Sequence, residues 1–141
     1  MTTGVIREWE VRLSKSDEMK PDRISEAEHA VMEVLWERGT VTAAEVCDAV
    51  CETRGWSLPT VKTLLSRLVQ KQAISTRPDG RRFLYTALIA RADYVGGESR
   101  RLVDRLFGGK ASSLFAHLAE QEALTEDDLA AIEALLKELK Q

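Results

Sequence analysis

The sequence has few of the residues that mark disulfide scaffolds, metal sites or membrane spans. Among its 141 residues there are only two cysteines, two histidines and three prolines. Two cysteines are too few for the disulfide framework of a small secreted protein or for a cysteine-rich metal site. Apolar runs stay below the roughly 18 residues of a membrane-spanning helix, and charged residues interrupt the segment where a signal peptide would be apolar. These absences predict a cytoplasmic protein with no membrane insertion and no cofactor.

The groups that catalysis requires are also missing, so we do not expect an enzyme. The sequence shows no serine, histidine and aspartate in a nucleophilic pattern, no glycine-rich phosphate loop and no paired acids in a pocket pattern. Cys47 and Cys51 are one helical turn apart and could form half of a metal site or a redox switch. No nearby ligands complete a tetrahedral metal site, and a disulfide fits poorly within a regular helix. We interpret both cysteines as small packing residues.

Charge is distributed unevenly along the chain. The net charge of −3 argues weakly against a nucleic-acid partner, because affinity for DNA comes mostly from cations that meet phosphates. However, residues 24–53 contain one basic and seven acidic side chains, whereas residues 54–82 contain seven basic and one acidic, a net of +6. Such polarisation is typical of a chain with one surface that faces phosphate. The alternative is a basic face that contacts only solvent.

Three short helices are predicted after an N-terminal segment, residues 1–23, that has no helical or strand period and is expected to be a flexible arm. Ser25 and Thr42 each begin a capping box with a glutamate three residues later. Ser57 caps a third helix, in which Pro59 is tolerated in the first turn. Because a compact turn joins the last two helices, the pattern predicts a helix-turn-helix.

The third helix is strongly amphipathic. Its apolar residues recur at helical spacing from Val61 to Val69 and predict a buried stripe. The opposite face carries two cations and no acid, which suits a recognition helix in a DNA major groove. This polar face consists of Thr60, Lys62, Thr63, Ser66, Arg67 and Gln70.

A β-hairpin is predicted next, with strands at residues 74–77 and 82–86 around a turn sequence at 78–81. Three helices followed by a hairpin predict a winged helix. Phe83 and Tyr85 share one strand face and are assigned to the core. The predicted DNA contacts are Thr60, Lys62, Thr63, Ser66 and Arg67 of the third helix, together with Arg77, Arg81 and Arg82 near the tip of the wing.

Residues 90–141 return to a helical pattern. The helices predicted in these roughly 50 residues have more apolar surface than they can bury alone, which predicts a helical dimerisation domain. The alternative is that they fold back on their own N-terminal domain. The predicted dimer contacts are Leu102, Leu106, Leu129, Ile132, Leu136 and Leu139.

Four segments carry a resemblance to a known family. They are ISEAEHAVMEVLW at residues 24–36, WSLPTVKTLLSRL at 56–68, RRFLYT at 81–86 and SLFAHLAEQEALTEDDLAAIEALL at 113–136. In these segments the chain resembles the penicillinase repressor (BlaI/MecI) family of bacterial transcription factors, over about residues 24–140. The resemblance implies a winged-helix DNA-binding domain and a helical dimerisation domain that act as a homodimeric repressor on dyad-symmetric operators.

The resemblance also implies a mode of release, in which a membrane sensor metalloprotease triggers cleavage within the dimerisation domain. The best-known members are cleaved between Asn and Phe, and the matching positions here are His117 and Leu118. The related copper-responsive repressors carry C-terminal Cys-x-Cys motifs that this tail lacks, which excludes copper sensing by that route. Relatives place glycine after the recognition helix, where this chain has Gln72, so a different helix C-cap is expected.

The sequence therefore predicts a mainly α protein with a small β-hairpin wing. Its expected parts are an arm at 1–23, a winged-helix DNA-binding domain at 24–89 and a helical dimerisation domain at 90–141. The predicted function is a homodimeric repressor on a double-stranded, dyad-symmetric DNA operator, released by proteolysis. The alternative is a winged-helix adaptor that uses the basic face for an acidic protein partner.

Overall fold

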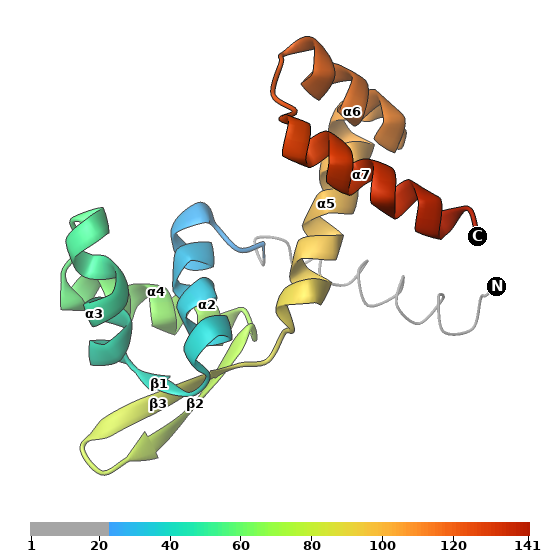
Figure 1. The fold of residues 1–141 in the computed structure, drawn as a ribbon. Coiled ribbons are helices and arrows are strands. Elements are labelled where there is room, and N and C mark those ends of the chain that lie inside the picture. Colours follow the sequence, from blue (N-terminus) through green and yellow to red (C-terminus); the bar gives the residue numbers. More distant parts are fainter. Residues whose placement is uncertain (1–22) are drawn as a thin grey trace, which may run out of the picture. The chain divides into compact units, whose positions relative to one another are not determined.

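The computed structural model describes residues 23–141, which belong to two compact units. The first unit ends at Arg91 and the second comprises Ala92–Gln141. Apart from Arg23, the predicted arm lies outside the described residues. In chain order the elements are α2 (Glu26–Arg38), β1 (Val41–Thr42), α3 (Ala43–Arg54), α4 (Leu58–Gln70), β2 (Ile74–Asp79), β3 (Arg82–Ala87), α5 (Arg91–Phe107), α6 (Ala111–Glu120) and α7 (Glu126–Leu139) (Figure 1).

Side-chain caps determine where the helices of the first unit begin. The Ser25 hydroxyl accepts the Glu28 backbone N–H at 3.1 Å, and the Glu28 carboxylate accepts the Ser25 N–H at 2.8 Å. Thr42 and Glu45 form the same reciprocal pair at the start of α3. Ser57 caps α4, where proline occupies the first turn and needs no backbone donor. The predicted starts of all three helices are confirmed.

The hairpin and one short extra strand form an antiparallel sheet in the order β1-β3-β2. β2 and β3 pair from Ile74 opposite Ala87 to Asp79 opposite Arg82. β1 pairs with Leu84 and Tyr85 of β3. The sequence predicted the hairpin but not β1, because two residues are too few to show strand alternation. The element order and the sheet confirm the winged-helix fold.

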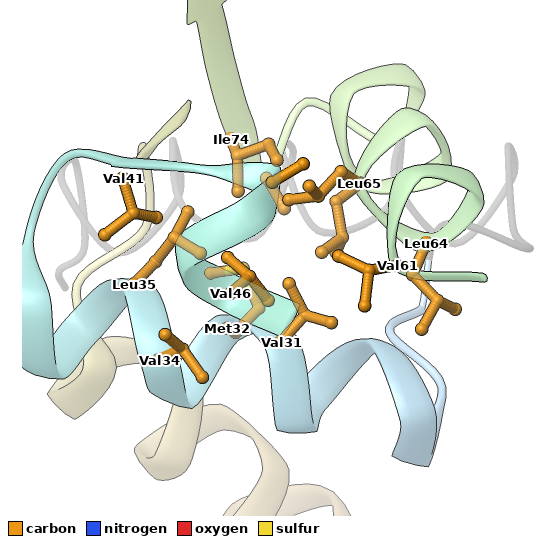
Figure 2. Packing of buried hydrophobic residues seen from close by; sticks show 13 residues of the cluster. Val31, Met32, Val34, Leu35, Val41, Val46, Val61, Leu64, Leu65 and Ile74 are labelled. Atoms are coloured by element: carbon orange, nitrogen blue, oxygen red, sulfur yellow. The ribbon is translucent and has the colours of Figure 1, made fainter. Parts of the chain in front are cut away.

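The hydrophobic core of the first unit lies among α2, α3, α4 and the sheet (Figure 2). Its largest fully buried apolar side chains are Met32, Leu35, Leu65, Leu68 and Ile74. The apolar stripe predicted for α4 is confirmed, since Val61, Leu64, Leu65 and Leu68 are all buried. Burial of this stripe fixes the rotation of α4 about its axis and leaves its polar face at the surface.

Two polar contacts tie the chain after β3 to α2. The Trp36 indole N–H donates to the Ile89 carbonyl at 2.7 Å. Two guanidinium nitrogens of Arg91 donate to the two carboxylate oxygens of Glu33 at 2.9 and 3.1 Å. The hydrogen bond from Arg91 lowers the pKa of Glu33, and the Arg91 charge adds to this effect. The first residue of α5 is therefore held against the winged helix.

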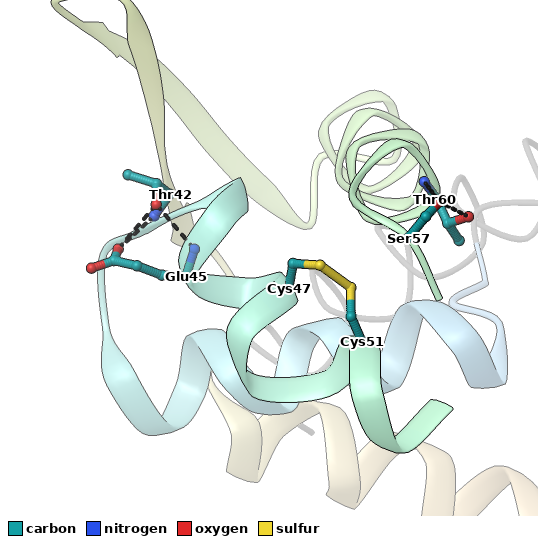
Figure 3. Close-up of a disulfide and its surroundings, with 6 residues drawn as sticks. All are labelled: Thr42, Glu45, Cys47, Cys51, Ser57 and Thr60. Carbon is teal, nitrogen blue, oxygen red and sulfur yellow. Dashed lines mark hydrogen bonds between the residues drawn. A yellow bond between two sulfur atoms is a disulfide. The ribbon is translucent and has the colours of Figure 1, made fainter. Parts of the chain in front are cut away.

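Cys47 and Cys51 are joined by a disulfide within α3 (Figure 3). The prediction that they are unbonded packing residues is wrong, although both are partly buried against the core. Their Cα atoms are 4.8 Å apart, which lies within the usual range of about 4.4–6.8 Å for disulfides. One turn of α3 is thus short enough for a disulfide, contrary to the expectation from the sequence.

The second unit contains the predicted helical segments, and the helices α5, α6 and α7 contain no buried residue. α5 runs through Gly96 and Gly97 without a break. Thr125 and Asp128 form a capping box at the start of α7. Large apolar side chains stay exposed on these helices, from 43% at Phe115 to 72% at Leu139. Across residues 23–141, no helix combines the length and the apolar character needed to cross a membrane.

Candidate nucleic-acid interface

The polar face of α4, defined as Thr60, Lys62, Thr63, Ser66, Arg67 and Gln70, is exposed at every position. The Ser57 cap and the buried stripe together set where the helix starts and which side faces out. The exposed side chains are hydroxyls, an amide and two cations. These groups can donate hydrogen bonds to phosphates and to base edges.

One surface hollow joins α4 to the wing. Lys62 of α4 and the wing residues Arg81 and Arg82 line it together with Phe83 and Tyr85. Thr42, Ala43 and Ala44 at the start of α3, and Leu58, complete its lining. The structure therefore brings together three of the cations predicted as DNA contacts, although they come from different elements.

A second hollow connects the middle of α4 to the hairpin. It is lined by Ser66, Val69 and Gln70 of α4, Thr76 of β2, and Phe83 and Tyr85 of β3. The polar face of α4 and the wing thus form one continuous surface. The other predicted contact residues line neither hollow, although they are exposed; they are Thr60, Thr63, Arg67 and Arg77.

Only some of the seven basic residues in segment 54–82 are unpaired. Lys71 Nζ lies 2.6 Å from a Glu28 oxygen, and Arg54 lies 3.3 Å from Glu26. Arg82 lies 3.1 Å from Asp79 in the exposed wing. Within residues 23–141, no ion pair is formed by the other four cations, Lys62, Arg67, Arg77 and Arg81. Net charge alone could not make this distinction, because the acidic partners of Lys71 and Arg54 come from the acidic segment 24–53.

Phe83 is a surface residue that the sequence assigned to the core. Its side chain is 52% exposed, whereas Tyr85, on the same face of β3, packs against the core. β1 pairs with Leu84 and Tyr85 and extends no further toward the wing tip. The alternation of side chains along a strand indicates which face is buried, but it does not show at which residue of β3 the core ends. The sequence contained one signal of a surface role, because Phe83 directly follows the arginines Arg81 and Arg82.

The C-terminal end of α4 does not have the different cap geometry that was expected because Gln72 stands in place of glycine. The residue adopts a φ of +64°, in the left-handed region that glycine favours. Its neighbour Ala73 donates its N–H to the Leu68 carbonyl at 3.0 Å and so closes the helix end. A glycine-type C-cap therefore forms here without glycine.

The arrangement is suited to binding a polyanion. Its unpaired cations attract phosphate, and its hydroxyls and amide can position a ligand by hydrogen bonds. Among the residues that the structure describes, the potential metal ligands form no group of three. The polar face of α4 contains no acid that would repel DNA.

Comparison with known proteins adds a sequence relationship. The family described as penicillinase repressor matches residues 24–138. The penicillinase repressor of Bacillus licheniformis is 31% identical over 121 residues, which are 86% of this chain and 94% of that protein. The methicillin resistance regulatory protein MecI of Staphylococcus aureus strain N315 is 27% identical over 117 residues, 83% of this chain and 95% of that protein. A solution structure of monomeric Bacillus licheniformis BlaI in complex with the blaP half-operator is 39% identical, covers 51% of this chain and 88% of that one, and has a TM-score of 0.45.

Proposed function

Since this chain belongs to the penicillinase repressor family, we propose that it is a DNA-binding transcriptional repressor. The observation that carries the proposal is the continuous surface formed by the acid-free polar face of α4 and the wing. α4 has the dimensions to enter a major groove, and the wing then meets the flanking backbone. Occupation of a promoter by this surface would block transcription.

Each group on this surface has a chemical role in the proposal. Arg67 and Lys62 reach base edges or the adjacent phosphates, with Thr63 and Ser66 between them. Thr60, at the start of α4, and the wing residues Arg77, Arg81 and Arg82 bind phosphates. Phe83 contacts a thymine methyl group or a deoxyribose, which would remove its exposed ring from water.

We expect Arg67→Ala to weaken binding to a preferred duplex by about 1–3 kcal/mol, because Arg67 is exposed, forms no ion pair within residues 23–141 and can bond both acceptors of a guanine. The duplex is first selected from a random-sequence library by the wild-type chain, and affinity is measured by fluorescence anisotropy. Arg81→Ala is the matched comparison. This variant should lose a similar amount of affinity for selected and for scrambled duplexes. The slope of log affinity against log salt concentration should become shallower by about one unit.

These measurements also test the alternative function. An unchanged affinity of the Arg67→Ala variant would remove Arg67 from the base contacts. An unchanged salt slope for Arg81→Ala would remove it from the phosphate contacts. If the wild-type chain bound no duplex even at low salt, the repressor proposal would fail in favour of an adaptor with an acidic protein partner.

We further propose that the active form is a homodimer assembled through the second unit. The proposal is supported by the absence of buried residues in α5, α6 and α7 and by the exposed leucines at 106, 129, 136 and 139. A second copy offers the same apolar faces and can cover them. Two winged helices related by a two-fold axis would then read a dyad-symmetric operator.

Leu136→Glu should convert the dimer to a monomer, because it places a charge among the apolar side chains of α7. Leu136 is 48% exposed within one chain, and sizing chromatography with light scattering gives the mass. Leu88→Glu is the control, since Leu88 is 60% exposed but lies in the first unit. A dimer that survives Leu136→Glu would exclude this part of α7 from the interface.

Release by a membrane sensor protease system stays a prediction. The His117–Leu118 bond lies inside α6, where backbone groups are paired within the helix. Proteases act on extended segments, so cleavage at this bond would require local unwinding of α6.

A further inference from the structure

We propose that Cys47 and Cys51 form a reversible thiol–disulfide site at which a hydroperoxide oxidises the chain and lowers its affinity for DNA. The coupling to DNA rests on the proposed function. The site lies outside the candidate interface, and neither cysteine lines its hollows. Cys47 and Cys51 thus have a role in this proposal, although neither residue belongs to the DNA-binding surface.

The location of the bond favours a reversible role over a structural one. A chain that represses transcription works where thiols are kept reduced, and disulfides that form there are mostly transient or redox-sensing. Both cysteines are partly exposed, so a small oxidant or a small thiol can reach them. The bond also closes a loop of only four residue steps, for which the stabilisation of the folded state is small.

The pair lies in the helix that precedes α4 and next to the turn between them. The Cys51 carbonyl accepts the backbone N–H of Gly55, the C-cap of α3, and that of Trp56 at 3.0 Å. Ser57, the next residue, caps α4. A movement of the Cys51 backbone is therefore transmitted through consecutive residues to the start of α4.

In the bonded state this turn is shorter than a turn of regular α-helix. Four residues of regular α-helix advance about 6 Å along the axis, whereas the Cα atoms of Cys47 and Cys51 lie 4.8 Å apart. A reduced turn of regular geometry would therefore differ from the bonded turn by about 1 Å, and binding sites tolerate displacements of only about 0.5 Å. Oxidation thus displaces the turn that leads into the polar face of α4.

The peroxide is the oxidant that accepts the two electrons released when the two thiols form a disulfide. The thiolate of one cysteine attacks a peroxide oxygen and breaks the O–O bond, which gives a sulfenic acid and releases an alcohol or water. The second sulfur then displaces the sulfenic oxygen, which leaves as water, and the disulfide forms. Two molecules of a small thiol reverse the reaction by exchange and leave as their own disulfide.

Whether oxidation raises or lowers the affinity for DNA follows from which redox state the chain has by default. Reduced thiols are the default in the compartment where a repressor works, and a repressor must hold its operator in that default state. The dithiol form is therefore the tighter binder. Oxidation should weaken binding by at least about fivefold, the lower end of typical coupling between two sites.

The test uses the full chain and a duplex selected from a random-sequence library by the reduced protein. Hydrogen peroxide is added to the wild type, and mass spectrometry with thiol alkylation verifies that the Cys47–Cys51 bond has formed. Anisotropy then gives the affinity before oxidation, after oxidation and after re-reduction with dithiothreitol. Cys47→Ser/Cys51→Ser is the matched control, and Cys47→Ala/Cys51→Ala replaces it if the serines unfold the helix.

We expect wild-type affinity to fall and then recover on reduction, while the variants without cysteines stay constant. The inference is overturned if peroxide does not form the bond, if the bond forms without a change in affinity, or if the variants lose affinity equally. A failure of the reduced wild type to select any duplex would refute the repressor proposal instead. In that case the thiol chemistry is still decided by the mass measurement.

Discussion

Replacing Lys71 with methionine should lower the free energy of unfolding by about 3–5 kcal/mol, because it leaves a buried carboxylate without its cation. The Glu28 side chain is only 2% exposed, and Lys71 Nζ lies 2.6 Å from its Oε1. Lys71 also donates to the Arg23 carbonyl at 2.8 Å. The ammonium group thus joins the C-cap of α4 to the start of α2, and methionine keeps the length of the side chain without its charge.

Urea denaturation near neutral pH measures this loss, and two variants control for it. Arg54→Met removes the cation of an exposed pair whose Glu26 side chain is 81% exposed. It should change stability by less than about 1 kcal/mol. Lys71→Met combined with Glu28→Gln should recover part of the loss, since no buried charge then remains. Equal losses for Lys71→Met and Arg54→Met would show that the Lys71–Glu28 pair acts as a surface ion pair.

The same pair gives stability a defined dependence on acid. Burial raises the pKa of Glu28, but hydrogen bonds from Lys71 and Ser25, together with the Lys71 charge, outweigh it and lower the pKa below the ordinary 4.5. The contribution of Glu28 is therefore complete above its unfolded-state pKa and disappears as the pH falls through the lowered folded-state value. The difference between wild type and Lys71→Met should accordingly shrink in acid.

The second large effect is expected at Leu65, which is fully buried on the apolar stripe of α4. Leu65→Ala should lower the free energy of unfolding by about 2–5 kcal/mol, through lost burial and an incompletely filled cavity. Leu88→Ala is a matched leucine truncation at a side chain that is 60% exposed, and it should change stability by only about 0.5 kcal/mol. Chemical denaturation at one fixed protein concentration compares the two. Similar losses would contradict the placement of α4 over the core.

Local signals in the sequence were sufficient for the starts of the helices in the first unit and for the buried stripe of α4, because these signals act over three or four residues. The capping boxes at Ser25 and Thr42 and the stripe on α4 depend on contacts within one helix, and all were predicted. β1 depends on pairing with residues more than forty positions away in β3, which no local period reveals. The exposure of Phe83 likewise depends on where that pairing ends.

The candidate site was predicted in its residue types but not in its electrostatics. Lys71 counted toward the basic segment, yet its partner Glu28 is 43 positions away in sequence. Among the residues that the structure describes, the cations of this segment that form no ion pair are Lys62, Arg67, Arg77 and Arg81. The disulfide was missed because a regular helix was judged a poor fit for such a bond, whereas the Cα separation of 4.8 Å in α3 lies within the usual range of about 4.4–6.8 Å.

The lack of buried residues in α5, α6 and α7 has a consequence for how stability depends on the amount of this protein in the cell. If a second copy supplies the missing cover, the stability of these helices follows the law of mass action and rises with the amount of protein in the cell. Dilution then loosens the second unit while the first unit, with its own core, stays folded. α6 would become easier to unwind as the copy number falls, so a low-abundance pool would be degraded faster than an abundant one.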